Sequence, residues 1–230
     1  MAEIKKILIA NRGEIVQRAV RTIREMGKKS VAVYSAGDKN ASYLKHADEA
    51  VCIGGAKSKD SYLNIPAIIT AAEMTGCDAI FPGYGFLSEN QDFVEICRLH
   101  NIKFIGPSVE VMEKMADKSK AKEEMIRAGV PVVPGSKGSV HSVTEGKKVA
   151  LEIGYPIMAK AAAGGGGRGM RLIHDESEFD QLFMAASSEA LAAFGDGTMY
   201  LERFINNPRH IEVQVVGDSH GNAIHIGERD

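Results

Sequence analysis

The sequence predicts an α/β protein: an N-terminal parallel β-sheet with helices on both faces, followed by a smaller α+β lobe. Short β-rich runs alternate with helical patterns through the first half of the 230 residues. From about Ser108 the alternation gives way to two helices, followed by Gly129-Val-Pro-Val-Val-Pro-Gly135, where two prolines forbid a helix and favour an extended connector. With 44% hydrophobic and 25% charged residues, the chain has the composition of a globular protein with a substantial core.

The first half consists of strand–helix–strand units, in which Gly27 and Gly76 close two of the helical patterns. Strands joined by helices run parallel, and the ligands of such sheets gather at the carboxyl ends of the strands. We expect strands at 6–10, 30–34, 50–53, 78–81 and 103–105, and helices at 14–26, 66–75 and 91–100.

The second half begins with two helices and the proline-containing connector. We expect helices at 109–116, 119–128, 144–153 and 176–193, and strands at 156–161, 170–173, 199–204, 211–216 and 223–226. This pattern divides the chain into an N-terminal domain (1–115), a helical linker (116–135), a lobe (136–204) and the start of another sheet (205–230). Because no helix covers the apolar face of the last two strands, we expect a truncated piece of a longer protein.

Charge and cysteine content exclude several classes of protein. The net charge of −2 comes from 28 basic and 30 acidic residues, so no basic field for nucleic acid is expected. No stretch approaches the ~20 apolar residues that span a bilayer. Cys52, Cys77 and Cys97 are widely spaced and odd in number, which favours a reducing cytoplasm over a disulfide framework.

The strongest local signal is the glycine-rich run from Lys160 to Met170. A loop nearly free of side chains can wrap phosphates with its backbone N–H groups, while Lys160 and Arg168 neutralise them. The next residues read as a strand rather than a helix, and no Gly-Lys-Ser/Thr follows, so neither a dinucleotide fingerprint nor a Walker A loop is indicated. We expect a β-hairpin flap. A plain surface turn is the alternative, and Lys160 in an otherwise apolar strand favours phosphate.

Other candidates are weaker on their own. Lys118 begins a helix, and a solvated lysine is the alternative. The segment 202–205 ends a strand, where backbone groups can pair with an adenine, or it is an ordinary strand. His210 is either a ribose or phosphate contact or a surface histidine. Asn11 and the loop 82–90 lie on the expected ligand side of the first sheet, with Asn11 a possible helix cap and Ser88 and Asn90 expected to act as caps.

Taken together, these segments resemble the biotin carboxylases, including the carboxylase parts of acetyl-CoA, propionyl-CoA and pyruvate carboxylases. The resemblance covers nearly the whole chain. It is carried by the segments Ile9-Ala-Asn-Arg-Gly-Glu-Ile15, Ser61-Tyr-Leu-Asn64, Pro82-Gly-Tyr-Gly-Phe-Leu-Ser-Glu-Asn90, Phe104-Ile-Gly-Pro107, Asp117-Lys118, Ala128-Gly-Val-Pro131, Gly164 to Met170 and Asn207-Pro-Arg-His-Ile-Glu212.

The resemblance implies an ATP-grasp enzyme with a pre-ATP-grasp N-terminal domain, in which two lobes hold ATP and the glycine loop closes over it. By the resemblance, Lys118 and Lys160 pair with ATP phosphates, residues 202–205 hold adenine and His210 contacts the nucleotide. The loop of Tyr84 and Gly85 matches the one near the biotin pocket. The full set of implied ATP-binding residues is Lys118, Lys160, Gly165, Gly166, Gly167, Arg168, Gly169, Met170, Glu202, Arg203, Phe204, Ile205 and His210.

The implied reaction makes carboxyphosphate from bicarbonate and ATP, with Mg²⁺ or Mn²⁺, and carboxylates biotin on a carrier protein. The implied partners are the biotin carboxyl carrier protein, a carboxyltransferase component and a second copy of the chain. Arg203 stands where many members have lysine, and Ala163 where a glycine is frequent. The metal and catalytic residues of the family follow the last residue of this chain, so we expect these 230 residues alone to be inactive.

Two other functions fit parts of the pattern. One is an ATP-grasp ligase that activates a carboxylate for attack by an amine, although the segments around Asn11 and Tyr84 favour the biotin branch. The other is a non-catalytic nucleotide-binding module, which would bury the apolar strands 211–216 and 223–226 against a partner.

Overall fold

The computed structural model describes residues 3–116, 118–162 and 169–229. The chain divides into two compact units, Met1–Ala121 and Lys122–Asp230. The predicted elements are confirmed in order and type, with ends that differ by one or two residues or a few at the final strand. Short 3₁₀ helices between β2 and α2 had no sequence signal. The four-segment division of the chain stays a prediction.

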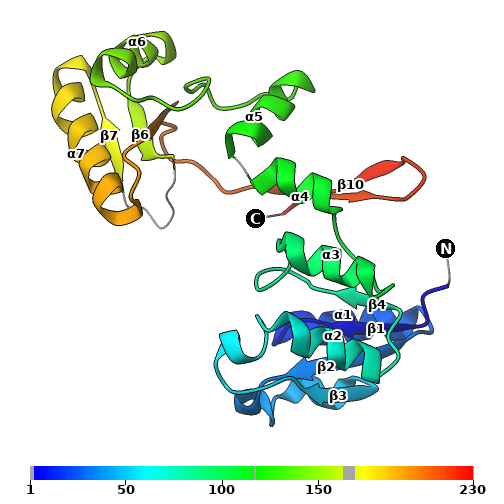
Figure 1. Cartoon of the computed structure of the whole chain (residues 1–230). Helices are drawn as coiled ribbons and strands as arrows, with labels where there is room; N and C mark the ends of the chain where they lie inside the picture. Colours follow the sequence, from blue (N-terminus) through cyan, green and yellow to red (C-terminus); the bar gives the residue numbers. More distant parts are fainter. Residues whose placement is uncertain (1–2, 117, 163–168, 230) are drawn as a thin grey trace. The chain divides into compact units, whose positions relative to one another are not determined.

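The first unit is a five-stranded parallel sheet in the order β3-β2-β1-β4-β5 (Figure 1). Chain order reverses between β1 and β4, so the loops that follow these two strands meet at the switch point of the sheet. The elements are β1 (Lys6–Ile9), α1 (Glu14–Glu25), β2 (Lys29–Tyr34), β3 (Glu49–Cys52), α2 (Ile65–Met74), β4 (Ala79–Phe81), α3 (Gln91–Leu99), β5 (Lys103–Phe104), α4 (Val109–Ala116) and α5 (Lys118–Arg127), the last of which runs into the second unit.

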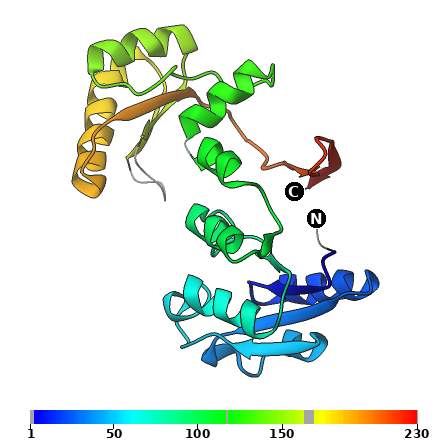
Figure 2. The same ribbon diagram turned by 45° about the vertical axis from the view of Figure 1, so that its right-hand side comes forward.

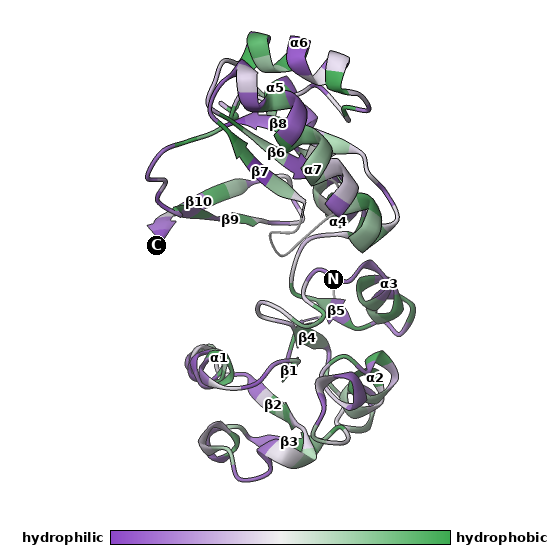
Figure 3. Cartoon of the chain, turned by 90° about the vertical axis from the view of Figure 1, so that its left-hand side faces the viewer, coloured by the Kyte–Doolittle hydropathy of each residue, from purple (hydrophilic) through white to green (hydrophobic). Residues whose placement is uncertain are grey.

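Helices cover both faces of this sheet, as predicted. Ile7 and Ile9 of β1 pack with α1 residues on one face, whereas Leu8 packs with α2 and α3 residues on the other. Figure 3 shows α1 on one side of the strands and α2 and α3 on the opposite side. Burial on both faces explains why β1 reads as a continuous apolar run rather than an alternating one.

The second unit contains a three-stranded antiparallel sheet in the order β7-β6-β8, followed by the hairpin β9–β10. Two helices, α6 and α7, pack on one face of the sheet (Figure 2). The elements are α6 (Val143–Ile153), β6 (Ile157–Ala161), β7 (Met170–Ile173), α7 (Glu176–Phe194), β8 (Met199–Arg203), β9 (Glu212–Gly217) and β10 (Ala223–Arg229).

The core of the second unit forms under α6 and α7. Phe179 of α7 is fully buried and stacks on Phe183 with ring centroids 5.3 Å apart. Gly146 of α6 faces this pair, and a Cβ there would come within 2.7 Å of Phe179 Cζ. The glycine therefore lets the two helices approach closely enough to bury both rings.

We expect Phe179→Ala to destabilise the second unit by about 3–5 kcal/mol, because it removes a fully buried ring and leaves a cavity. Two measurements check this: the free energy of unfolding from urea denaturation, and the hydrogen-exchange rates of the amides of β6 and β8. Met184→Ala is the matched control, since Met184 lies on the same helix with its side chain 54% exposed. If Phe179→Ala lowers the free energy of unfolding no more than Met184→Ala does, this description of the core is contradicted.

Candidate functional site

One face of the sheet in the second unit is not covered by α6 or α7. Ile157 and Ala159 of β6 point into the core, so Met158 and Lys160 occupy the opposite face. Lys160 lies directly opposite Met170 on β7 and Tyr200 on β8. The residues that the strand registers place together on this surface, called here the open face, are Met158, Lys160, Met170, Leu172, Tyr200 and Glu202. It combines an apolar platform with charged groups.

Lys160 forms an ion pair with Glu202 on this face. The two side chains are 35% and 25% exposed, so both charges are partly withdrawn from water. The strand register brings a carboxylate within reach of Lys160, so the charge of this lysine has a partner without any phosphate, and its assignment as a phosphate contact stays a prediction. A bound anion would share Lys160 with Glu202.

A second lysine reaches the sheet in the same unit. Lys122 of α5 donates a hydrogen bond to the hydroxyl of Tyr200, and its Nζ lies 5.1 Å from the centre of that ring. Sequence reasoning missed both residues, because no motif contains them and the contact joins positions far apart in the chain.

Backbone hydrogen bonds to neighbouring segments fix the end of β8. The N–H of Arg203 donates to the carbonyl of Pro134 at 2.8 Å, and the N–H of Phe204 donates to the carbonyl of Pro156 at 2.9 Å. The guanidinium of Arg203 donates to the carbonyl of Ile153 at the end of α6, a favourable position for a cation. The arginine therefore belongs to the covered side of the sheet and not to the open face.

The other predicted nucleotide contacts fall in different places. Lys118 begins α5. Gly169 has φ +65°, and a Cβ there would come within 2.9 Å of Ala161 Cβ, so glycine is required at the foot of the hairpin. Ile205 is 49% exposed. His210 is 83% exposed, and its Nε2 lies 3.8 Å from Glu212 Oε1. Gly165, Gly166, Gly167 and Arg168 lie outside the described residues.

In the first unit, Asn11 organises the switch point between β1 and β4. Its side chain is 3% exposed, and Nδ2 donates to the carbonyls of Pro82 and Tyr84, each at 2.8 Å. Its Oδ1 accepts the N–H of Arg12 at 2.8 Å. The possibility that Asn11 caps a helix is thus excluded, since its amide instead joins the loop after β1 to the loop after β4.

Only one of the two expected caps of α3 is confirmed. Asn90 accepts the N–H of Phe93 at 2.8 Å and forms the N-cap of the helix. The expectation for Ser88 is wrong, because the helix begins at Gln91 and Ser88 lies two residues before the cap.

The loop after β4 presents Tyr84, whose side chain is 56% exposed. The Tyr84 hydroxyl donates to Glu14 Oε1 at 2.5 Å. Gly83 and Gly85 have φ values of +66° and +71°, and a Cβ at Gly83 would come within 2.6 Å of Ile15 Cδ1. The two glycines therefore allow a tight, left-handed turn that holds the tyrosine at the switch point.

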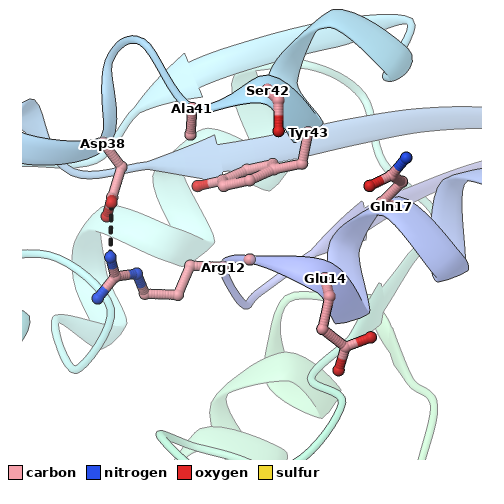
Figure 4. Close-up of a pocket in the computed structure, with 8 residues that line it drawn as sticks. Arg12, Glu14, Gln17, Asp38, Ala41, Ser42 and Tyr43 are labelled. Carbon is pink, nitrogen blue, oxygen red and sulfur yellow. Dashed lines mark hydrogen bonds and ion pairs between the residues drawn. The ribbon is translucent and has the colours of Figure 1, made fainter.

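A pocket of about 350 Å³ opens beside the loop after β1 and the start of α1 (Figure 4). Arg12 and Asp38 lie at its edge and form an ion pair at 2.7 Å. Burial alone would raise the pKa of Asp38, but hydrogen bonds from Tyr62 and Ser35 and the Arg12 guanidinium outweigh it and lower the pKa. Asp38 therefore stays ionised and holds the Arg12 side chain in place. The residues that line the pocket are Arg12, Gly13, Glu14, Gln17, Asp38, Ala41, Ser42 and Tyr43.

Two kinds of structural feature are absent from the described part of the chain. No group of three or more His, Cys, Asp or Glu side chains there is arranged to hold a metal ion. None of the helices in the described ranges is both long and apolar enough to cross a bilayer.

Comparison with known proteins connects both units to one group. Residues 3–112 match the family model of the biotin carboxylase N-terminal domain, and residues 117–230 match the ATP binding domain of the carbamoyl-phosphate synthase L chain. The chain is 58% identical over 225 residues to a biotin carboxylase from Nostoc sp. and 52% identical over 227 residues to biotin carboxylase 1 from Bacillus subtilis. These matches cover 98% and 99% of this chain and 50% of each relative, so the chain spans about half the length of the curated relatives it matches.

Solved structures agree. A biotin carboxylase–β,γ-ATP complex from Campylobacter jejuni matches with a TM-score of 0.86 and 67% identity, over 98% of this chain and 51% of that one. The biotin carboxylase domain of a thermophilic 2-oxoglutarate carboxylase bound to bicarbonate matches with a TM-score of 0.89 and 47% identity, over 99% of this chain and 49% of that one.

We expect Asn11→Ala to destabilise the first unit by about 2–3 kcal/mol, because it leaves one buried and one partly buried carbonyl without their donor. Hydrogen exchange should also accelerate in residues 82–88. The measurement combines denaturant unfolding with exchange detected by mass spectrometry. Asn40→Ala, at an exposed position of the same unit, is the control. Unchanged exchange in 82–88 would contradict the role of Asn11.

Proposed function

This chain belongs to the biotin carboxylase family, and from this premise we propose that the full-length protein uses ATP to carboxylate biotin with bicarbonate. The observation that carries the proposal is the open face of the β7-β6-β8 sheet, where a lysine, a carboxylate and apolar side chains lie together in the unit that matches an ATP binding domain. Of the two solved relatives described above, the Campylobacter jejuni enzyme is a complex with β,γ-ATP, and the 2-oxoglutarate carboxylase domain is bound to bicarbonate.

We assign the nucleotide to the open face. Met158, Met170 and Leu172 offer a flat apolar surface to the base, and Lys160 offers a cation to the phosphates. The amides of Arg203 and Phe204 already donate to protein carbonyls, so adenine recognition falls to the other backbone groups of 202–205. We further propose Lys118, His210 and the loop 165–169 as contacts to the phosphates and ribose, as the resemblance implies.

In the proposed reaction, bicarbonate oxygen attacks the terminal phosphorus of ATP and ADP departs, which gives carboxyphosphate. Carboxyphosphate releases carbon dioxide and phosphate, and the deprotonated ureido nitrogen of biotin attacks the carbon dioxide. The lysines of the site neutralise the phosphate charge that develops in these steps. We assign biotin to the loop of Tyr84 and Gly85, where Asn11 and Glu14 fix the tyrosine.

Mg²⁺ or Mn²⁺ accompanies ATP in this proposal, and its protein ligands are not assigned to the described residues, which hold no suitable cluster. The biotin is carried by a biotin carboxyl carrier protein, and a carboxyltransferase component selects the final acceptor. With acetyl-CoA as acceptor, the reaction feeds fatty acid biosynthesis; pyruvate and propionyl-CoA are the alternative acceptors. A homodimer completes the proposed assembly. We place the protein in the cytoplasm, a proposal supported by its three free cysteines.

The direct test is ATP hydrolysis by the full-length protein with bicarbonate and magnesium, with and without free biotin. We expect hydrolysis that requires bicarbonate and rises with biotin, and no such activity from residues 1–230 alone. Hydrolysis that is indifferent to biotin and instead requires an amine and a second carboxylate would overturn the proposal in favour of another ATP-grasp ligase.

Lys160→Ala in the full-length protein should weaken ATP binding by about 10–100-fold, because it removes a cation and leaves the Glu202 carboxylate unpaired beside the phosphates. The measurement is calorimetric titration with ATP and magnesium. Lys45→Ala, at an exposed position of the first unit, is the control and should bind normally. Adding Glu202→Gln to Lys160→Ala should recover part of the loss. Equal affinities for Lys160→Ala and Lys45→Ala would remove Lys160 from the site.

A further inference from the structure

Lys122 holds a cation over the open face that has no ion-pair partner among the described residues. Its side chain is partly buried, and its ammonium donates to the neutral hydroxyl of Tyr200. Among the ion pairs of the described residues, Lys160 is joined to Glu202, whereas none includes Lys122. A partly desolvated ammonium with only a phenol as partner retains most of its attraction for an anion.

The strand register fixes where this charge lies. Tyr200 is the direct partner of Lys160 across β8 and β6, and side chains of such pairs stand about 5 Å apart on one face. The ammonium that Tyr200 holds is therefore on the same surface as the Lys160–Glu202 pair. Lys122, Lys160 and Glu202 together leave that surface with a net positive charge.

The space for this contact is provided by a glycine. Gly135 pairs with Glu202 in an isolated bridge beside β8. A Cβ at Gly135 would lie 2.6 Å from the Tyr200 hydroxyl and 2.8 Å from Lys122 Nζ. Any larger residue would displace the ammonium from the phenol, so the backbone is shaped around the contact.

We propose that Lys122 is a further nucleotide-binding residue, whose ammonium is directed by Tyr200 toward the phosphates of ATP on the open face. The inference rests on the proposed function and extends it, because neither the resemblance nor the comparisons assign a role to Lys122. Tyr200 acts as a positioning residue: it orients the ammonium and does not touch the phosphates. The chemistry recognised is the negative charge of a nucleoside triphosphate, so affinity should depend on the number of phosphates.

The test uses the full-length protein with Lys122→Met, which keeps the length of the side chain and removes its charge. Lys148→Met is the matched control, since Lys148 is an exposed lysine of α6 in the same unit. Calorimetric titrations with ATP, ADP, AMP and adenosine compare ligands that share the base and differ in charge.

We expect Lys122→Met to weaken ATP binding about tenfold, ADP less, and adenosine not at all, with Lys122→Arg recovering most of the loss and Lys148→Met unchanged. Equal weakening of all four ligands would indicate a purely structural role and overturn the inference. Wild-type affinity for ATP in Lys122→Met would overturn it as well.

Tyr200→Phe tests the positioning role separately. It should weaken ATP binding about threefold in the wild-type background and have no added effect in Lys122→Met, because the hydroxyl then has no ammonium to direct. If Tyr200→Phe and Lys122→Met each weaken ATP binding by their own factor and the factors multiply in the double variant, the proposed coupling is contradicted. Failure of the unaltered protein to bind ATP at all would instead refute the proposed function, which separates the two conclusions.

Discussion

Helices α6 and α7 both cover the same face of the β7-β6-β8 sheet, and the arrangement of the candidate nucleotide site on the opposite face depends on this asymmetry. Because side chains alternate along a strand, burying Ile157 and Ala159 under α6 and α7 commits Met158 and Lys160 to the opposite surface. A shift of one residue in the register would exchange these sets and place a lysine in the core. The apolar packing that stabilises the unit thus also fixes the position of its charges.

The first unit positions its candidate residues by a different device. Its parallel sheet is buried on both faces, so polar groups gather at the carboxyl ends of the strands. There the buried amide of Asn11 joins two loops that are about 70 residues apart in sequence, and glycines allow the turn that carries Tyr84. The amide of Asn11 therefore holds the two loops together without any strand pairing between them. Tyr84 remains exposed in this arrangement.

Much of the fold could be predicted from the sequence because the apolar periodicity of strands and helices and the glycines that end helices are properties of short segments. Apolar runs marked the strands, glycines marked helix ends such as Gly27 and Gly76, and the order of elements implied a parallel sheet. The partners of Lys160 and Asn11 could not be predicted in this way. Glu202 reaches Lys160 only through the strand register, and Asn11 bonds to carbonyls rather than capping a helix. Lys122 and Tyr200 belong to no motif, so only the folded unit brings them together.

In this proposal the nucleotide binds to the open face, on the side of the sheet away from α6 and α7. The most direct measurement is a crystal structure of the full-length protein with a non-hydrolysable ATP analogue and magnesium. We expect the base to lie against Met158, Met170 and Leu172 and the phosphates to lie within hydrogen-bond reach of Lys160. A nucleotide bound instead at the carboxyl ends of β1 and β4, with the open face empty, would contradict it.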